Sequence, residues 1–167
     1  MARSNAAGNG PRTPYREAMK HLIHERWESV WQAIPAAIEG GDPEGVHDVR
    51  VASRRLRAAM DVAVEAFPAD WYKPLHRVAR EITSELGEVR DREVQIEYMV
   101  NVRESLPPGE QVGIDRLIAR LGRERDSART EMLEYLSNLE RKNVRGQVDH
   151  RFGPSPESTP SQLGKSE

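Results

Sequence analysis

Apolar residues recur at intervals of three and four along most of this chain, and this spacing constrains its fold more than any other feature. Between about residues 15 and 142 the intervals match the 3.6-residue repeat of an α-helix, which places apolar side chains on one face. No segment shows the strict alternation of apolar and polar residues that is typical of a half-buried strand. The sequence therefore predicts an all-α fold, an antiparallel bundle of four to five helices with short connections.

Glycines and prolines divide the repeat into separate helices. We expect Asp42 to cap the second helix and Gly87 to end the third, and we expect Pro35 to kink the first helix or end it early. The motif LPPG, at residues 106–109, is a further break. The predicted helices span about 15–39, 42–67, 70–87, 92–105 and 110–142.

The two ends of the chain have a different composition from its middle. Residues 1–13 are predicted to be a disordered leader, residues 14–142 the helical bundle, and residues 143–167 a disordered tail rich in proline and serine. The leader lacks the apolar centre of a secretory signal, and no run of 18 apolar residues could span a membrane. We therefore expect a cytoplasmic protein without membrane contact. The chain contains no cysteine, which excludes disulfides and thiolate metal sites.

Residues 46–57, VHDVRVASRRLR, carry five basic or potentially basic side chains, although the net charge of the chain is −2 at pH 7. On a helix, His47, Arg50, Arg54 and Arg57 fall within an arc of roughly 80° beside the apolar face. We call these four residues the arginine stripe. Arg55 lies on the opposite side of the apolar face.

A stripe of one sign is unusual, because like charges three or four residues apart cost about 0.2–0.5 kcal/mol per pair. Such local costs are typical of functional sites, and the planar guanidinium matches two phosphate oxygens at once. An isoelectric point of about 6.2 and the lack of aromatic residues in the stripe argue against nucleic acid as the ligand. The stripe thus favours an anion rich in phosphate but without bases. The alternative, that these arginines pair with carboxylates of neighbouring helices, stays open.

Other chemistries find less support in the sequence. Glu44 and His47 form a Glu-x-x-His pair of the kind found in di-iron bundles, but a second pair is missing and the nearby arginines oppose a cation. His21 and His24 are three residues apart, with no third metal ligand in evidence. The chain has no phosphate-binding glycine loop, no dinucleotide fingerprint and no nucleophile elbow. We therefore predict no catalytic residues, no metal and no cofactor.

Two motifs resemble those of a known family. VHDVRVASRRLR, followed at residues 86–94 by LGEVRDREV, is similar to the signatures of the CHAD family, the conserved histidine α-helical domain. The resemblance spans about residues 14–142 and implies a helical fold whose basic residues line a cavity for inorganic polyphosphate. Members of the family associate with polyphosphate granules or accompany triphosphate-processing domains, so association with such granules is also implied here.

The resemblance assigns phosphate-binding roles position by position. Glu93 stands where the family usually has aspartate, and Arg80 matches a commonly basic position less securely than the others. Asp91 matches the aspartate that follows the second motif's arginine. The implied phosphate-binding residues are His47, Arg50, Arg54, Arg55, Arg57, Arg80 and Arg90.

One departure from the family is larger. A complete domain of this kind has two similar halves, each with its own histidine helix, and this chain resembles the first half only. A homodimer could supply the second half. We therefore expect non-enzymatic binding of inorganic polyphosphate or a similar polyanion, with a protein-interaction scaffold that has lost the ligand as the alternative. An enzyme acting on phosphoanhydrides would need metal-binding carboxylates near the stripe, and the sequence shows none.

Overall fold

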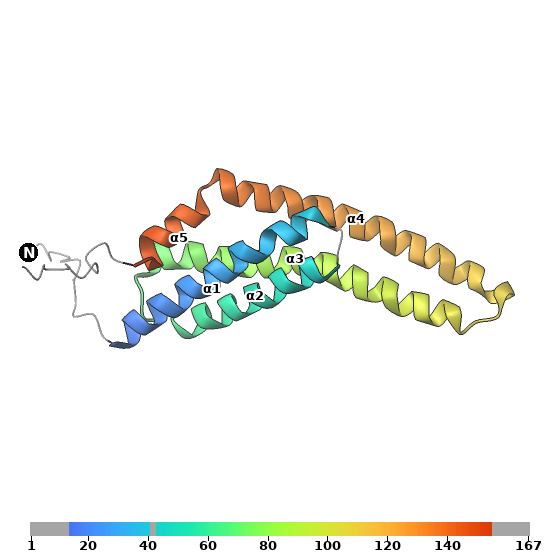
Figure 1. The fold of residues 1–167 in the computed structure, drawn as a ribbon, viewed down its shortest axis with the longest axis horizontal. Helices are drawn as coiled ribbons and strands as arrows, with labels where there is room; N and C mark the ends of the chain where they lie inside the picture. The colour runs from blue at the N-terminus through green and yellow to red at the C-terminus, as the bar shows by residue number, and fades with distance from the viewer. Residues whose placement is uncertain (1–13, 41–42, 155–167) are drawn as a thin grey trace, which may run out of the picture.

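The computed structural model describes residues 14–40 and 43–154, and all the regular elements in these ranges are helices. Successive long helices run antiparallel, as Figure 1 shows. The all-α bundle predicted from the sequence is thereby confirmed. The elements are α1 (Pro14–Glu39), α2 (Pro43–Val62), α3 (Ala69–Glu104), a short 3-10 helix (Pro108–Glu110), α4 (Gln111–Arg141) and α5 (Val144–Phe152).

The core fills the part of the molecule where α1 and α2 lie against α3 and α4. Each long helix packs against the next one in sequence, and α5 packs against α1 and α4. The Tyr72 hydroxyl donates a buried hydrogen bond of 2.7 Å to the carbonyl of Met60, which ties the start of α3 to the end of α2. The largest fully buried side chains are Trp27, Tyr72, Phe152, Ile23, Leu56, Met60, Ile82, Leu86 and Met132.

One predicted helix end agrees with the structure and another differs. α1 ends at Glu39, as the predicted span 15–39 requires, so Pro35 does not end it early, and Gly40 follows with a φ of 71° that suits glycine. α2 ends at Val62 rather than at residue 67, and the next residues form turns that place Phe67 against the ring of Tyr72. The predicted cap Asp42 lies outside the described residues.

The predicted break at Gly87 is wrong, because α3 is a single helix of 36 residues. A Cβ atom added at Gly87 would meet nothing within 4 Å, so this glycine lies on an open part of the helix surface. Glycine costs about 1 kcal/mol relative to alanine inside a helix. The burial of Leu86 and Val89 on the opposite side offsets that cost.

The predicted end of the folded region at residue 142 is also wrong. Residues Val144–Phe152 form α5, which turns back along α1. The turn uses Asn143 at φ 49°, and its side chain accepts a hydrogen bond from the backbone N–H of Gly146. Val144, Val148 and Phe152, four residues apart, form the buried face of α5. The segments 1–13 and 155–167, predicted to be disordered, lie outside the described residues.

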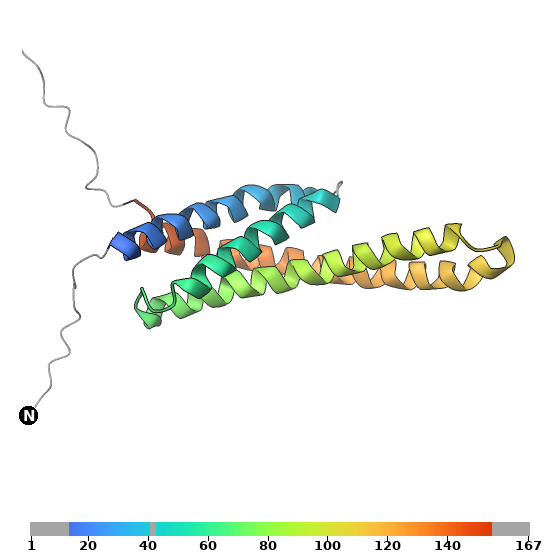
Figure 2. The ribbon, with the colours of Figure 1, turned by 90° about the horizontal axis from the view of Figure 1, so that it is seen from below.

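Beyond the ends of α1 and α2, α3 and α4 continue alone as a two-helix hairpin (Figures 1 and 2). The hairpin turns at the predicted LPPG break. No residue from 90 to 120 is fully buried, so the hairpin adds little to the core. None of the helices in the described ranges is long and apolar enough to cross a membrane.

Candidate anion-binding site

The arginine stripe lies on the side of α2 that is next to α3. Two contacts fix the antiparallel register of these helices. The imidazole Nε2 of His76 lies 2.7 Å from Oδ1 of Asp61, and the Thr83 hydroxyl donates a 3.2 Å hydrogen bond to the Ser53 hydroxyl. Continuing this register towards the start of α2 brings His47 opposite Arg90.

At that point the two helices form a surface hollow of about 440 Å³. His47 and Arg50 line it from α2, and Arg90 and Arg92 line it from α3. The structure thus brings together three residues that the sequence analysis selected from two separate motifs. The remaining lining residues are Asp91, Val94 and Gln95.

Several cations of this surface have no protein partner. In the part of the chain that the structure describes, the side chains of His47, Arg50, Arg54 and Arg80 form no ion pair and no hydrogen bond. Arg54 and Arg80 are exposed, whereas His47 and Arg50 are half-buried. A half-buried guanidinium with no partner is costly unless water or an anion satisfies it.

The other cations have weak, exposed or local partners. Nε of Arg57 lies 3.7 Å from Asp61, and both side chains are about half exposed. Nη1 of Arg90 donates to Glu93 across 3.3 Å, one helical turn away. Exposed pairs of the Arg57–Asp61 type contribute about 0–1 kcal/mol, which a polyanion can exceed.

The open position of Gly87 also contributes to the shape of this surface. By helical spacing, Arg80, Thr83, Gly87 and Arg90 follow one another along one side of α3, since they are three or four residues apart. Gly87 therefore adds no side chain between Thr83 and Arg90, and a Cβ atom there would meet nothing within 4 Å.

A comparison with protein-family models matches the CHAD domain over residues 21–165, nearly the whole chain. The chain belongs to the CHAD domain family. The match extends past both motifs and through α5, the segment that the sequence analysis left out of the fold. CHAD domains are helical binding domains associated with polyphosphate, and they are generally not catalytic. Comparisons with curated proteins and with solved structures find no match.

Two further arginines of the motifs line hollows. Arg55 lies apart from the stripe, as helical spacing predicts, and lines a smaller hollow of about 240 Å³ against α1, with Arg26 and Asp48. Arg92 lines the hollow between α2 and α3 and was not selected from the sequence, although it belongs to the second motif. Nε of Arg92 lies 3.1 Å from Glu124, so this arginine also joins α3 to α4.

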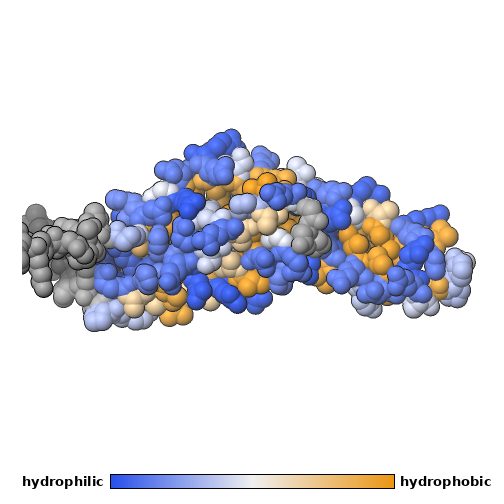
Figure 3. Space-filling view, viewed as in Figure 1, coloured by the Kyte–Doolittle hydropathy of each residue, from blue (hydrophilic) through white to orange (hydrophobic). Residues whose placement is uncertain are grey.

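A larger hollow of about 720 Å³ lies between α1 and α4 of this CHAD domain. Figure 3 shows hydrophobic surface there, and the walls include Trp31, Ile34 and Leu136. Two carboxylates, Glu39 and Glu140, also line it, together with Arg145, which is paired with Glu28. Apolar walls with two carboxylates and one paired guanidinium do not suit a polyanion, so the hollow between α2 and α3 is the better candidate.

Proposed function

We propose that this CHAD domain binds inorganic polyphosphate, or a polyanion of similar charge density, without catalysing a reaction. The proposed surface consists of the arginine stripe together with Arg80 and Arg90. The observation that carries the proposal is the hollow in which His47 and the unpaired, half-buried Arg50 face Arg90 across two helices.

The proposed mechanism is electrostatic. Each guanidinium presents parallel N–H donors to the oxygens of one phosphate, and successive phosphates follow the row of cations. Because Gly87 has no side chain, the surface of α3 beside Arg90 is open to a polyphosphate chain that continues towards Arg80. Binding releases counterions from the polyanion, so affinity should fall linearly with salt concentration on a log–log plot.

The first test is a titration of long-chain inorganic polyphosphate into the untagged chain at low and at moderate salt. Replacing Arg50 with glutamine should weaken binding and reduce the salt dependence. The matched control is Arg116→Gln, because Arg116 is exposed on the hairpin and has no ion pair among the described residues. Absence of binding at low salt, or an equal loss in the control, would contradict the proposal.

A second copy of the chain is the other partner that we propose, as a homodimer that completes the two-half architecture implied by the family. Two basic surfaces repel each other until a polyanion lies between them, so ligand and dimer should stabilise each other. Light scattering during the titration measures this linkage. If the particles still contain one protein chain each under conditions where polyphosphate binding is proven, this linkage is excluded. In cells, the same binding would place the protein at polyphosphate granules.

The scaffold alternative retains one supporting observation. Arg57 and Arg90 both have carboxylate partners, Asp61 and Glu93, as that alternative requires. In a scaffold these pairs would serve packing alone, and polyphosphate would not bind in the titration above.

A further inference from the structure

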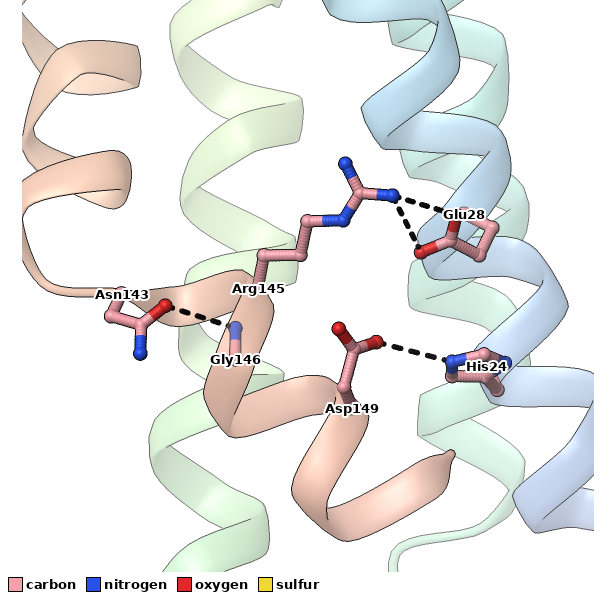
Figure 4. Close-up of polar contacts among 6 residues, drawn as sticks. All are labelled: His24, Glu28, Asn143, Arg145, Gly146 and Asp149. Carbon is pink, nitrogen blue, oxygen red and sulfur yellow. Dashed lines mark hydrogen bonds and ion pairs between the residues drawn. The ribbon is translucent and has the colours of Figure 1, made fainter. Parts of the chain in front are cut away.

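The junction of α1 and α5 brings together a second set of polar side chains, far from the arginine stripe in sequence. Figure 4 shows His24 and Glu28 on α1 facing Asp149 and Arg145 on α5. Nε2 of His24 lies 3.2 Å from Oδ1 of Asp149. One potential ligand atom from each of His24, Glu28 and Asp149 lies within 4.8 Å of the other two.

We propose that His24, Glu28 and Asp149 form a binding site for a divalent transition-metal ion of the zinc type. Zinc binds imidazole nitrogen and carboxylate oxygen at about 2.0–2.2 Å, which places two of its ligands about 3.3 Å apart. The distance between His24 and Asp149 already matches that separation. Three protein ligands leave a fourth position for water, and a mixed nitrogen and oxygen set favours zinc over magnesium.

The two helices hold these ligands in place without the metal. His24 and Glu28 are four residues apart on α1 and therefore lie on the same face, one turn from each other. Asp149 follows directly after Val148, which is fully buried, and α5 is further fixed by buried Phe152. His24 and Glu28 are only 21% and 27% exposed, so a bound ion would be partly shielded from water.

Arg145 gives this proposal a distinctive consequence. Its Nη2 donates to both carboxylate oxygens of Glu28, at 3.3 and 3.0 Å, and so competes with a metal ion for that ligand. If the cluster only fastens α5 to α1, the contacts between His24 and Asp149 and between Arg145 and Glu28 are sufficient without a metal ion. If it is a metal site, loss of Arg145 should increase the affinity for the ion.

The test is a titration of Zn²⁺ into the full untagged chain, in a buffer that does not chelate metals, followed by calorimetry and by thermal melting. One ion per chain should bind and raise the melting temperature, and Mg²⁺ should do neither. His24→Ala and Asp149→Asn should each lower the zinc affinity at least about tenfold. Arg145→Gln should raise it. Circular dichroism of each variant checks that the helices remain folded.

His21→Ala is the matched control, because His21 lies on the same helix, is 78% exposed and is near Glu25 rather than Asp149. It should bind zinc like the unaltered chain. The proposal is overturned if zinc does not saturate one site or if Mg²⁺ gives the same shift. It is also overturned if His24→Ala and Asp149→Asn bind zinc normally, or if His21→Ala loses binding.

Discussion

Replacing Arg54 with alanine should weaken polyanion binding and, at the same time, slightly stabilise the fold. Arg54 is exposed on α2 and has no ion pair in the described residues. Its charged neighbours one turn away are Arg50 and Arg57, and each such like-charge pair costs about 0.2–0.5 kcal/mol. The substitution removes both pairs and should raise the free energy of unfolding by about 0.5–1 kcal/mol. For a chain of this size, that corresponds to a rise in melting temperature of about 1–4 °C.

The effect on binding has the opposite sign. A hydrogen bond to a charged group contributes about 1.5–3 kcal/mol, so the affinity for polyphosphate should fall about tenfold or more at low salt. The slope of log affinity against log salt should become shallower by a little less than one for one lost phosphate contact. Fluorescence anisotropy with labelled polyphosphate, run beside thermal denaturation, measures both quantities on the same samples.

Arg92→Ala should change stability in the opposite direction from Arg54→Ala, because Arg92 joins α3 to α4 through Glu124. Loss of this pair should lower stability by up to about 1 kcal/mol. Marked destabilisation of the chain by Arg54→Ala, together with intact polyphosphate binding, would contradict this prediction. In that case Arg54 would serve packing, as the scaffold alternative requires.

Three further predictions concern the fold. Gly87→Ala should raise the free energy of unfolding by about 0.5–1 kcal/mol, measured by urea denaturation, because its Cβ meets no neighbour and α3 is helical there. Burial and the carboxylates of Glu131, Glu81 and Glu88 raise the pKa of Glu85 above its usual value, so the ionised group destabilises the folded state. Glu85→Gln should therefore raise the melting temperature at about pH 7, and the gain should shrink as the pH falls towards about 4. Phe152→Ala should cost about 3–5 kcal/mol by thermal denaturation, because the ring packs at 5.5 Å from those of both Phe67 and Trp71.

The sequence predicts the helices well where apolar spacing and proline agree. The LPPG break and the 110–142 helix follow from such agreement and are nearly correct. Gly87 misled the prediction because glycine is a strong signal for a helix end, whereas α3 stays helical there and buries Leu86 and Val89 on its other side. Tertiary packing of that kind is not visible in local sequence.

α5 was missed for a related reason. It has three apolar residues in its nine, and its composition resembles that of the tail that follows. Its stability comes from the partners of Val148 and Phe152 in a distant part of the chain. Missing α5 also hid Asp149, which the proposed metal site adds to His24 and Glu28.

The pairing of two motifs across α2 and α3 was within reach of the sequence, since His47, Arg50 and Arg90 were all selected from it. Their proximity depends on the register set by Ser53 with Thr83 and by Asp61 with His76. Helical spacing along one helix does not determine how that helix slides against its neighbour. Arg92 illustrates the same limit, because its place in the hollow depends on the direction in which α3 faces α2.

Asp61 contacts both the arginine stripe and α3. Its carboxylate is near both Arg57, at 3.7 Å, and His76, at 2.7 Å, so it neutralises one end of the arginine stripe. Asp61→Asn removes the charge but keeps an oxygen that can accept a hydrogen bond from His76. At an exposed site, one charge at about 4 Å is worth about 1 kcal/mol in water, so the affinity for polyphosphate should rise about fivefold.

The same titration at low salt measures this gain, and a melting temperature close to that of the unaltered chain would show that the register is kept. Asp115→Asn is the control, since Asp115 pairs with Arg103 on the hairpin, away from the stripe. If Asp61→Asn binds no more tightly than the control, Arg57 does not contact the polyanion. The binding surface would then end at Arg54 and extend only from there to the hollow between His47, Arg50 and Arg90.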